Sequence, residues 1–236
     1  MDSMLRAGRL VVAMVGLAVA LTAACTPAPY GDDADGGSNP GQDGGADAGP
    51  AHAGLVFQWQ NLPTLPGGLG ESLYLDEVRM PLRDVRAIGD AAPGDSRTYV
   101  SSLDLLWKHG EWPPVLSFPM APPGLYSRFE FRVQSGEGEG YVLSGEIVLP
   151  GHDHKVKFAI HDSQMLSVSV PLTGLSLEAG QVKTVLVKIN IAAVLSAIDW
   201  SQVHVDDDEI DIGEDSPEIS IIRAVLATSI SATVIP

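Results

Sequence analysis

The densest group of residues that could do chemistry is the acidic run from Asp206 to Asp215, with the sequence DDDEIDIGED. Carboxylate oxygens are the ligands that Ca²⁺ takes in proteins. The candidate metal ligands in this run are Asp206, Asp208 and Asp211. An EF-hand loop is not present, because no glycine follows the third ligand and no glutamate closes the loop. Ile210 and Ile212 alternate with charged residues, which is typical of an edge strand that carries charges against aggregation. A solvated edge is therefore the favoured interpretation, and a calcium-stabilised loop is the alternative.

Three histidines are the other candidates for metal binding, and they are His152, His154 and His161. His152 and His154 are two residues apart, so in extended backbone their side chains point the same way, as ligands of one metal must. His161 would lie about 23 Å from His154 along a strand that rises 3.3 Å per residue, too far to join them. We interpret these histidines as turn residues in water.

Trp107 and Trp112 flank a predicted turn at residues 108–111. Exposed aromatic rings stack on sugars, whereas buried rings pack in a core. Trp107 and Trp112 are therefore candidate ligand-binding residues, and packing in the core is the favoured alternative.

No catalytic motif accompanies these residues. The sequence contains no G-x-S-x-G turn, no H-E-x-x-H pair and no glycine-rich phosphate loop. Glu137 and Glu139 lie among glycines, where a turn would not hold the geometry that catalysis requires. We expect a protein that is not an enzyme, with an uncharacterised enzyme as the disfavoured alternative.

The single cysteine, Cys25, stands at the end of a predicted signal peptide. Arg6 and Arg9 precede the apolar run 10–21, and three small residues separate that run from Cys25, which is the pattern of a secretory signal. The apolar run is too short to span a bilayer, which takes about 20 residues. Residues 1–24 are therefore expected to be removed, and thiol catalysis is excluded if Cys25 is modified.

The stretch Leu21-Thr22-Ala23-Ala24-Cys25 resembles the lipobox of bacterial lipoproteins, although Thr22 stands where the commonest lipobox has leucine. The resemblance implies that the Cys25 thiol carries acyl chains such as palmitate and that cleavage occurs before it. Two or three acyl chains anchor a protein stably to a membrane, at about 0.8 kcal/mol per buried CH₂. Thr26 after the cysteine, by analogy with lipoprotein sorting, favours the outer membrane or cell surface over the inner membrane.

Composition separates a tether from a domain. Residues 25–53 are rich in Pro, Gly, Ala and Asp and cannot bury enough surface to offset the entropy of ordering, so they are expected to form a disordered tether. Its mean span is on the order of 30 Å. The net charge of −16 argues against nucleic acid as a partner and against polybasic docking on anionic lipid.

Residues 54–236 are predicted to form one antiparallel β-sandwich, because short alternating runs are separated by Gly and Pro. The predicted strands are 55–59, 72–80, 83–88, 99–106, 125–133, 141–149, 155–160, 166–170 and 182–191. The residues expected to face the core are Phe129, Phe131 and Val133 on one strand and Val185, Val187 and Ile189 on another. Residues 150–154 form the turn of the clearest hairpin.

Two short helices are expected near the C-terminus. One covers residues 191–198. The other begins with Ser216 as the N-cap and Pro217 at the first helical position. Its buried face is expected to contain Ile219, Ile222, Val225 and Leu226. Residues 229–235 are expected to extend this helix, with a final strand as the alternative.

Two motifs suggest a family. Pro122-Pro123-Gly124-Leu125-Tyr126 precedes one predicted strand, and Leu177-Glu178-Ala179-Gly180-Gln181 precedes another. Their order over residues 122–199 resembles the bacterial surface lipoproteins grouped as DUF4382, which implies a transthyretin-like or immunoglobulin-like sandwich. That family brings no established activity. We therefore expect a membrane-anchored envelope lipoprotein that binds a protein, a glycan or another envelope component, with the calcium-stabilised module as the alternative.

Overall fold

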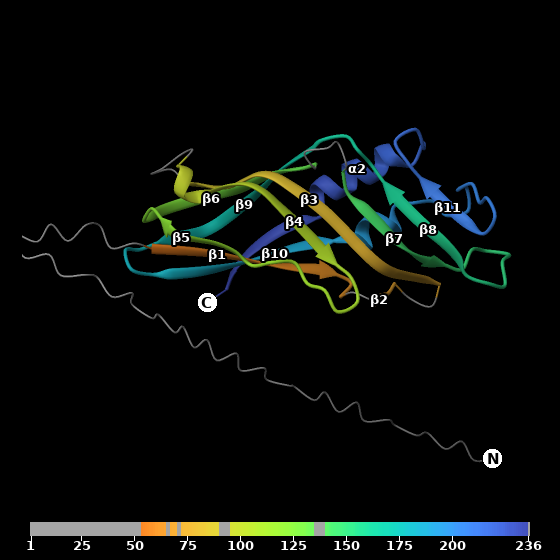
Figure 1. The fold of residues 1–236 in the computed structure, drawn as a ribbon, viewed down its shortest axis with the longest axis horizontal. Coiled ribbons are helices and arrows are strands. Elements are labelled where there is room, and N and C mark those ends of the chain that lie inside the picture. The colour runs from red at the N-terminus through yellow and green to blue at the C-terminus, as the bar shows by residue number, and fades with distance from the viewer. Residues whose placement is uncertain (1–52, 65–66, 70–71, 90–94, 135–139, 236) are drawn as a thin grey trace, which may run out of the picture. The chain divides into compact units, whose positions relative to one another are not determined.

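The computed structural model describes residues 53–64, 67–69, 72–89, 95–134 and 140–235. Two β-sheets enclose one apolar core in this part of the chain (Figure 1). The predicted mainly β sandwich with a few short helices is confirmed. The signal peptide, Cys25 and almost all of the predicted tether lie outside the described residues.

The smaller sheet has the strand order β12-β10-β1-β5. Its strands are β1 (Ala53–Leu62), β5 (Leu116–Ala121), β10 (Val182–Asn190) and β12 (Ile230–Ile235). β1 runs parallel to β10, whereas the other two pairs are antiparallel. β5 was missed in the sequence because Pro119 interrupts it, and an edge strand tolerates a proline there since its outer N–H groups need no partner.

The larger sheet has the order β11-β8-β7-β3-β6-β9, and the further strands β2 and β4 pair with β3. Its strands are β2 (Gly67–Gly68), β3 (Leu73–Gly89), β4 (Tyr99–Trp107), β6 (Gly124–Val133), β7 (Val142–Ile147), β8 (Val156–His161), β9 (Leu166–Leu177) and β11 (Glu209–Ile212). A 3-10 turn, η1 (Ser96–Thr98), precedes β4. β8 and β11 are parallel. Two parallel pairs thus depart from the antiparallel expectation, because in each pair the partners are far apart in sequence and meet by long crossovers.

The core lies between the sheets. The Phe57 ring of the smaller sheet stacks on the Phe129 ring of the larger sheet, with centroids 4.2 Å apart. The predicted inward residues of β6 and β10 are all buried, at 2 % exposure or less. The period-two pattern was therefore a correct guide to which face of each strand meets the other sheet.

The larger sheet contains a break. β6 pairs with residues 82–89 of β3, and β7 pairs with residues 73–79, so the two strands follow one another along one edge of β3. β8 and β9 continue this arrangement outward. At the break the Asp162 N–H donates to the Tyr141 carbonyl, 3.3 Å away. Gly140 allows this approach, since a Cβ there would lie 1.5 Å from the Asp162 carbonyl oxygen.

Two helices follow β10. α1 (Ile191–Ser196) agrees with the prediction, and the Asn190 side chain caps it by accepting from the Ala193 N–H. α2 (Ile219–Thr228) buries Ile219, Ile222 and Leu226 as expected, whereas Val225, also expected on the buried face, is only partly buried. It begins after the predicted Ser216 cap, because the Ser216 hydroxyl instead accepts from the Gly213 N–H.

The expectation that residues 229–235 extend this helix is wrong, because they form β12. The free edge of β10 offers backbone partners over its length, and β-branched residues such as Thr233 and Val234 suit a pleated strand. Within the described ranges, no helix has both the length and the apolar character needed to cross a membrane.

Candidate functional site

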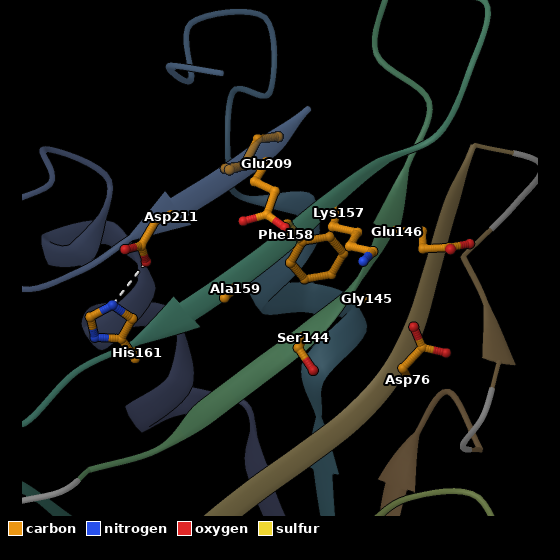
Figure 2. A pocket seen from close by; sticks show the side chains of 11 residues that line it. Asp76, Ser144, Gly145, Glu146, Lys157, Phe158, Ala159, His161, Glu209 and Asp211 are labelled. Carbon is orange, nitrogen blue, oxygen red and sulfur yellow. Dashed lines mark ion pairs between the residues drawn. The ribbon is translucent and has the colours of Figure 1, made fainter. Parts of the chain in front are cut away.

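A polar groove of about 490 Å³ lies on the outer face of the larger sheet, over β3, β7, β8 and β11 (Figure 2). Side chains on this face alternate with core residues, so that Ser144, Ala159 and Asp211 point outward while Phe158 and Ile210 fill the core side. The groove exists because small residues occupy its middle. Ser144 and Ala159 are paired neighbours on β7 and β8, and longer side chains surround them.

A row of charges crosses the groove beside these small residues. Glu146 of β7 is paired with Lys157 of β8, and Lys157 is paired with Glu209 of β11. Directly paired residues have Cβ atoms about 4.5–5.5 Å apart, so one cation stands between two carboxylates. The next row consists of Ser144, Ala159 and Asp211. The groove thus presents acidic and basic side chains next to one another on paired strands.

Ion pairs hold part of the lining in place. His161 Nε2 lies 2.8 Å from Asp211 Oδ1, and Lys155 Nζ lies 2.6 Å from Glu146 Oε2. Within the described part of the chain, the carboxylates of Asp76 and Glu209 make no ion pair or hydrogen bond through their side-chain oxygens. Burial raises the pKa of Asp76, and the nearby Glu146 raises it further against the opposite effect of Lys155. The groove therefore has two carboxylates free to bind a ligand.

Two further depressions continue the groove at its sides. One of about 480 Å³ shares Asp76 and Ser144 with it and extends to Tyr74, Lys108 and His109. The other, of about 410 Å³, shares Glu209 and Asp211 and lies across β11. Lys108 is bound to Glu77 at 2.8 Å. Together the three depressions form a polar surface that crosses the larger sheet.

The predicted metal ligands are not brought to one point. Asp208 Oδ1 lies 2.9 Å from His154 Nε2, whereas Asp211 is held by His161. Asp206 exchanges backbone hydrogen bonds with Glu209 across a tight turn. Among the described residues, no three His, Cys, Asp or Glu side chains are grouped as a metal site requires.

The acidic run instead forms an edge. Ile210 and Ile212 are 1 % exposed, and β11 is the edge strand of the larger sheet, as the alternation predicted. His154 precedes β8 and His161 is its last residue, and the two contact the carboxylates of Asp208 and Asp211 respectively. Hydrogen bonds to Asp153 and Asp208 raise the pKa of His154. Both histidine side chains are about half exposed, in agreement with the expected contact with water, and they also link the β11 segment to β8.

The two candidate tryptophans have different environments. Trp107 is 1 % exposed and belongs to the core, so its ring is not at the surface to stack on a ligand. Trp112 is 66 % exposed. The alternative of core packing therefore holds for Trp107, and of these two tryptophans Trp112 is the one at the surface.

Sequence reasoning missed a buried ion pair at the break in the larger sheet. Arg223 of α2 donates to both carboxylate oxygens of Asp162, at 2.6 and 2.7 Å. Burial alone raises the pKa of Asp162, but hydrogen bonds from Arg223 and from the Gln164 N–H outweigh it and lower the pKa. Burial also raises the pKa of the neighbouring Tyr141. No short-range pattern could have revealed a pair whose members are 61 residues apart.

Comparison with known proteins finds no matching family model, no matching curated protein and no matching solved structure. The resemblance to the DUF4382 lipoproteins therefore stays a prediction.

Proposed function

We propose that this protein is a lipid-anchored envelope protein whose β-sandwich binds a cationic partner in the polar groove and catalyses no reaction. The anchor is supported by the charge, apolar run and small residues that precede Cys25. Labelling with a palmitate analogue tests it, because the wild type should incorporate the label and Cys25→Ala should not. An unlabelled wild type contradicts the anchor.

The observation that carries the binding role is the pair of unpartnered carboxylates in the groove, Asp76 and Glu209. A cation bound there would remove the unfavourable effect of burial and of Glu146 on the Asp76 charge. The groove volume of about 490 Å³ falls in the range of small-ligand sites. Because the groove rests on four paired strands, its groups are already in place before a ligand arrives.

The chemistry of the groove indicates what the partner carries. Its carboxylates suit Lys or Arg side chains, and Lys157 between Glu146 and Glu209 offers a donor to a carbonyl oxygen. A basic segment of an envelope protein supplies both kinds of group. The excess of acidic residues in the chain, 30 against 14 Lys and Arg, steers such a partner toward it.

Calorimetry with a short lysine peptide tests the proposal. Asp76→Asn combined with Glu209→Gln removes both free carboxylates and should weaken binding about tenfold at low salt. Asp104→Asn with Glu178→Gln removes the same charge elsewhere on the exposed surface and serves as the matched control. Equal weakening in the two variants would show that only the overall charge matters and would overturn the groove assignment.

A glycan is the second candidate partner, and the exposed ring of Trp112 is the observation that favours it. Binding of an oligosaccharide that is lost in Trp112→Ala and unaffected by the groove variant would transfer the binding role to that surface.

A further inference from the structure

One end of the sandwich collects the start of β1, the end of β5, the start of β6, the end of β9 and the start of β10 (Figure 1, left side). Strand pairing holds them together, because Ala53 is opposite Ala121, Gly54 is opposite Val182, and Leu125 is opposite Ser176. We call this the anchor end, since the chain that leads back to Cys25 leaves the described domain here at Ala53.

Large apolar side chains are exposed at the anchor end. Met120 is 46 % exposed, Leu125 is 57 % exposed and Val182 is 67 % exposed. Met120 and Val182 belong to the smaller sheet and Leu125 to the larger one, so the apolar rim extends over both sheets. The three side chains are divided between the two sheets, so the outer face of one sheet does not contain all of them. A flat surface can therefore contact all three only if it meets the end of the sandwich.

Charge separates this end from the opposite one. The described segments that meet here, 53–55, 87–89, 95–98, 118–126 and 175–184, contain two acidic residues, Asp95 and Glu178, and two basic residues, Arg97 and Lys183. Residues 206–218, which form β11 and its flanks at the other end (Figure 1, right side), contain eight acidic residues and no Lys or Arg. In a chain of net charge −16, the anchor end is locally neutral. Anionic lipid headgroups repel the acidic end and not this one.

We propose that the anchor end docks on the lipid surface, with Met120, Leu125 and Val182 in the headgroup region, so that the domain stands end-on and directs β11 and the polar groove away from the membrane. This inference rests on the lipid anchoring proposed above. Ala53 follows Cys25 by 28 residues, and the mean span of the predicted tether is on the order of 30 Å. At such a high effective concentration even weak contacts produce docking. Neutral apolar side chains need no basic patch to enter the interface.

Site-specific fluorescence on the acylated full chain tests the orientation. Because Cys25 is the only cysteine and its thiol is acylated, an introduced cysteine is a unique labelling site. Ser176→Cys places a label at the anchor end opposite Leu125, and Gln202→Cys places one on the exposed segment before β11. The protein is reconstituted in phosphatidylethanolamine vesicles with a minor fraction of phosphatidylglycerol and a nitroxide-bearing quencher lipid. The label at residue 176 should be quenched, and the label at residue 202 should not.

The apolar rim is then removed with Met120→Ser, Leu125→Ser and Val182→Ser in the Ser176→Cys background. Each replacement should lower the ratio of docked to undocked protein about tenfold, so the combined variant should lose the quenching. The three side chains are exposed, and circular dichroism checks that the fold is kept. If the combined variant does not fold, Leu125→Ser alone gives the same reading with a partial loss.

Several outcomes would overturn the inference. Equal quenching at residues 176 and 202, or quenching that the serine variants leave unchanged, shows that the rim does not dock. Shielding of residue 176 that grows with protein concentration in detergent without vesicles assigns the rim to a second copy of the chain. If the protein floats with the vesicles but the label at residue 176 is not quenched, the docking is refuted and the anchor is not. Protein that does not float refutes the anchor and with it the docking.

Discussion

Replacing Arg223 by methionine should remove the ion pair between α2 and the break in the larger sheet. The Asp162 carboxylate is 0 % exposed in its side chain and receives both of its Arg223 hydrogen bonds at 2.7 Å or less. Arg223→Met keeps an unbranched apolar stem but removes the guanidinium, which leaves Asp162 buried without its counter-charge. Breaking a buried pair in this way costs about 3–5 kcal/mol. Because 23 % of the Arg223 side chain is exposed and water can reach it, we expect the lower limit, about 3 kcal/mol.

Urea denaturation followed by tryptophan fluorescence measures this loss. With an m value of about 2 kcal/mol/M, a loss of about 3 kcal/mol moves the midpoint by about 1.5 M. Arg132→Met is the matched control on β6, because its pair with Asp84 is 51 % and 42 % exposed and should contribute at most about 1 kcal/mol. Adding Asp162→Asn to Arg223→Met should recover much of the stability, because no buried charge is then left alone.

The pH dependence gives a second reading of the same pair. Because the folded pKa of Asp162 is lowered, its contribution is complete above the unfolded value of about 3.9 and is lost as the pH falls through the folded pKa. In Arg223→Met burial is left to raise the pKa of Asp162, so the stability difference between wild type and variant should be largest above that raised pKa. It should shrink as the pH falls through the raised pKa of the variant and then through the lowered pKa of the wild type. A difference below about 1 kcal/mol at pH 7, or a double variant no more stable than Arg223→Met, would refute the reasoning.

Three other predictions follow from burial and contacts. Trp107→Ala should lower the free energy of unfolding by about 3–5 kcal/mol, whereas Trp112→Ala, with its ring 66 % exposed, should leave the urea midpoint nearly unchanged, and similar losses would contradict the burial assignment. Gly140→Ala should destabilise the fold by about 2–3 kcal/mol because its methyl group would overlap the carbonyl across the break, and a wild-type melting temperature would show that this approach is not made. Proton NMR titration should place the pKa of His154 above its ordinary value and show a lower pKa in Asp208→Asn. The same His154 pKa in both proteins would show that the hydrogen bond between His154 and Asp208 is not formed in solution.

Much of the secondary structure followed from short-range patterns. Phe129, Phe131 and Val133 alternate with charged residues, and this alternation alone predicted which side of β6 is buried. The Ile210 and Ile212 alternation predicted the edge strand within the acidic run. The signal peptide, the acylation of Cys25 and the tether also come from sequence patterns, and they stay predictions because those residues are outside the described part.

Local sequence patterns gave the wrong prediction where contacts with distant parts of the chain determined the structure. The run from Ser229 to Ile235 could be helix or strand, and the open edge of β10 decided for β12. Pro119 concealed β5 because an edge strand tolerates what a central strand does not. Trp107 and Trp112 are five residues apart, yet one is buried and the other exposed, since strand β4 ends at the first of them.

The sequence by itself determined the class of fold, the inward faces of the strands, the net acidity and the predicted lipid anchor, because each depends on residue type or on spacing of a few positions. Only the tertiary structure decided which polar residues meet. Glu146 and Lys157 belong to one hairpin, but Asp76 and Glu209 come from strands far from it in the sequence, and the pairing of these strands places all four residues in one groove. The Asp162–Arg223 pair and the apolar rim at the anchor end arise in the same way, since both depend on where distant segments cross and not on their local sequence.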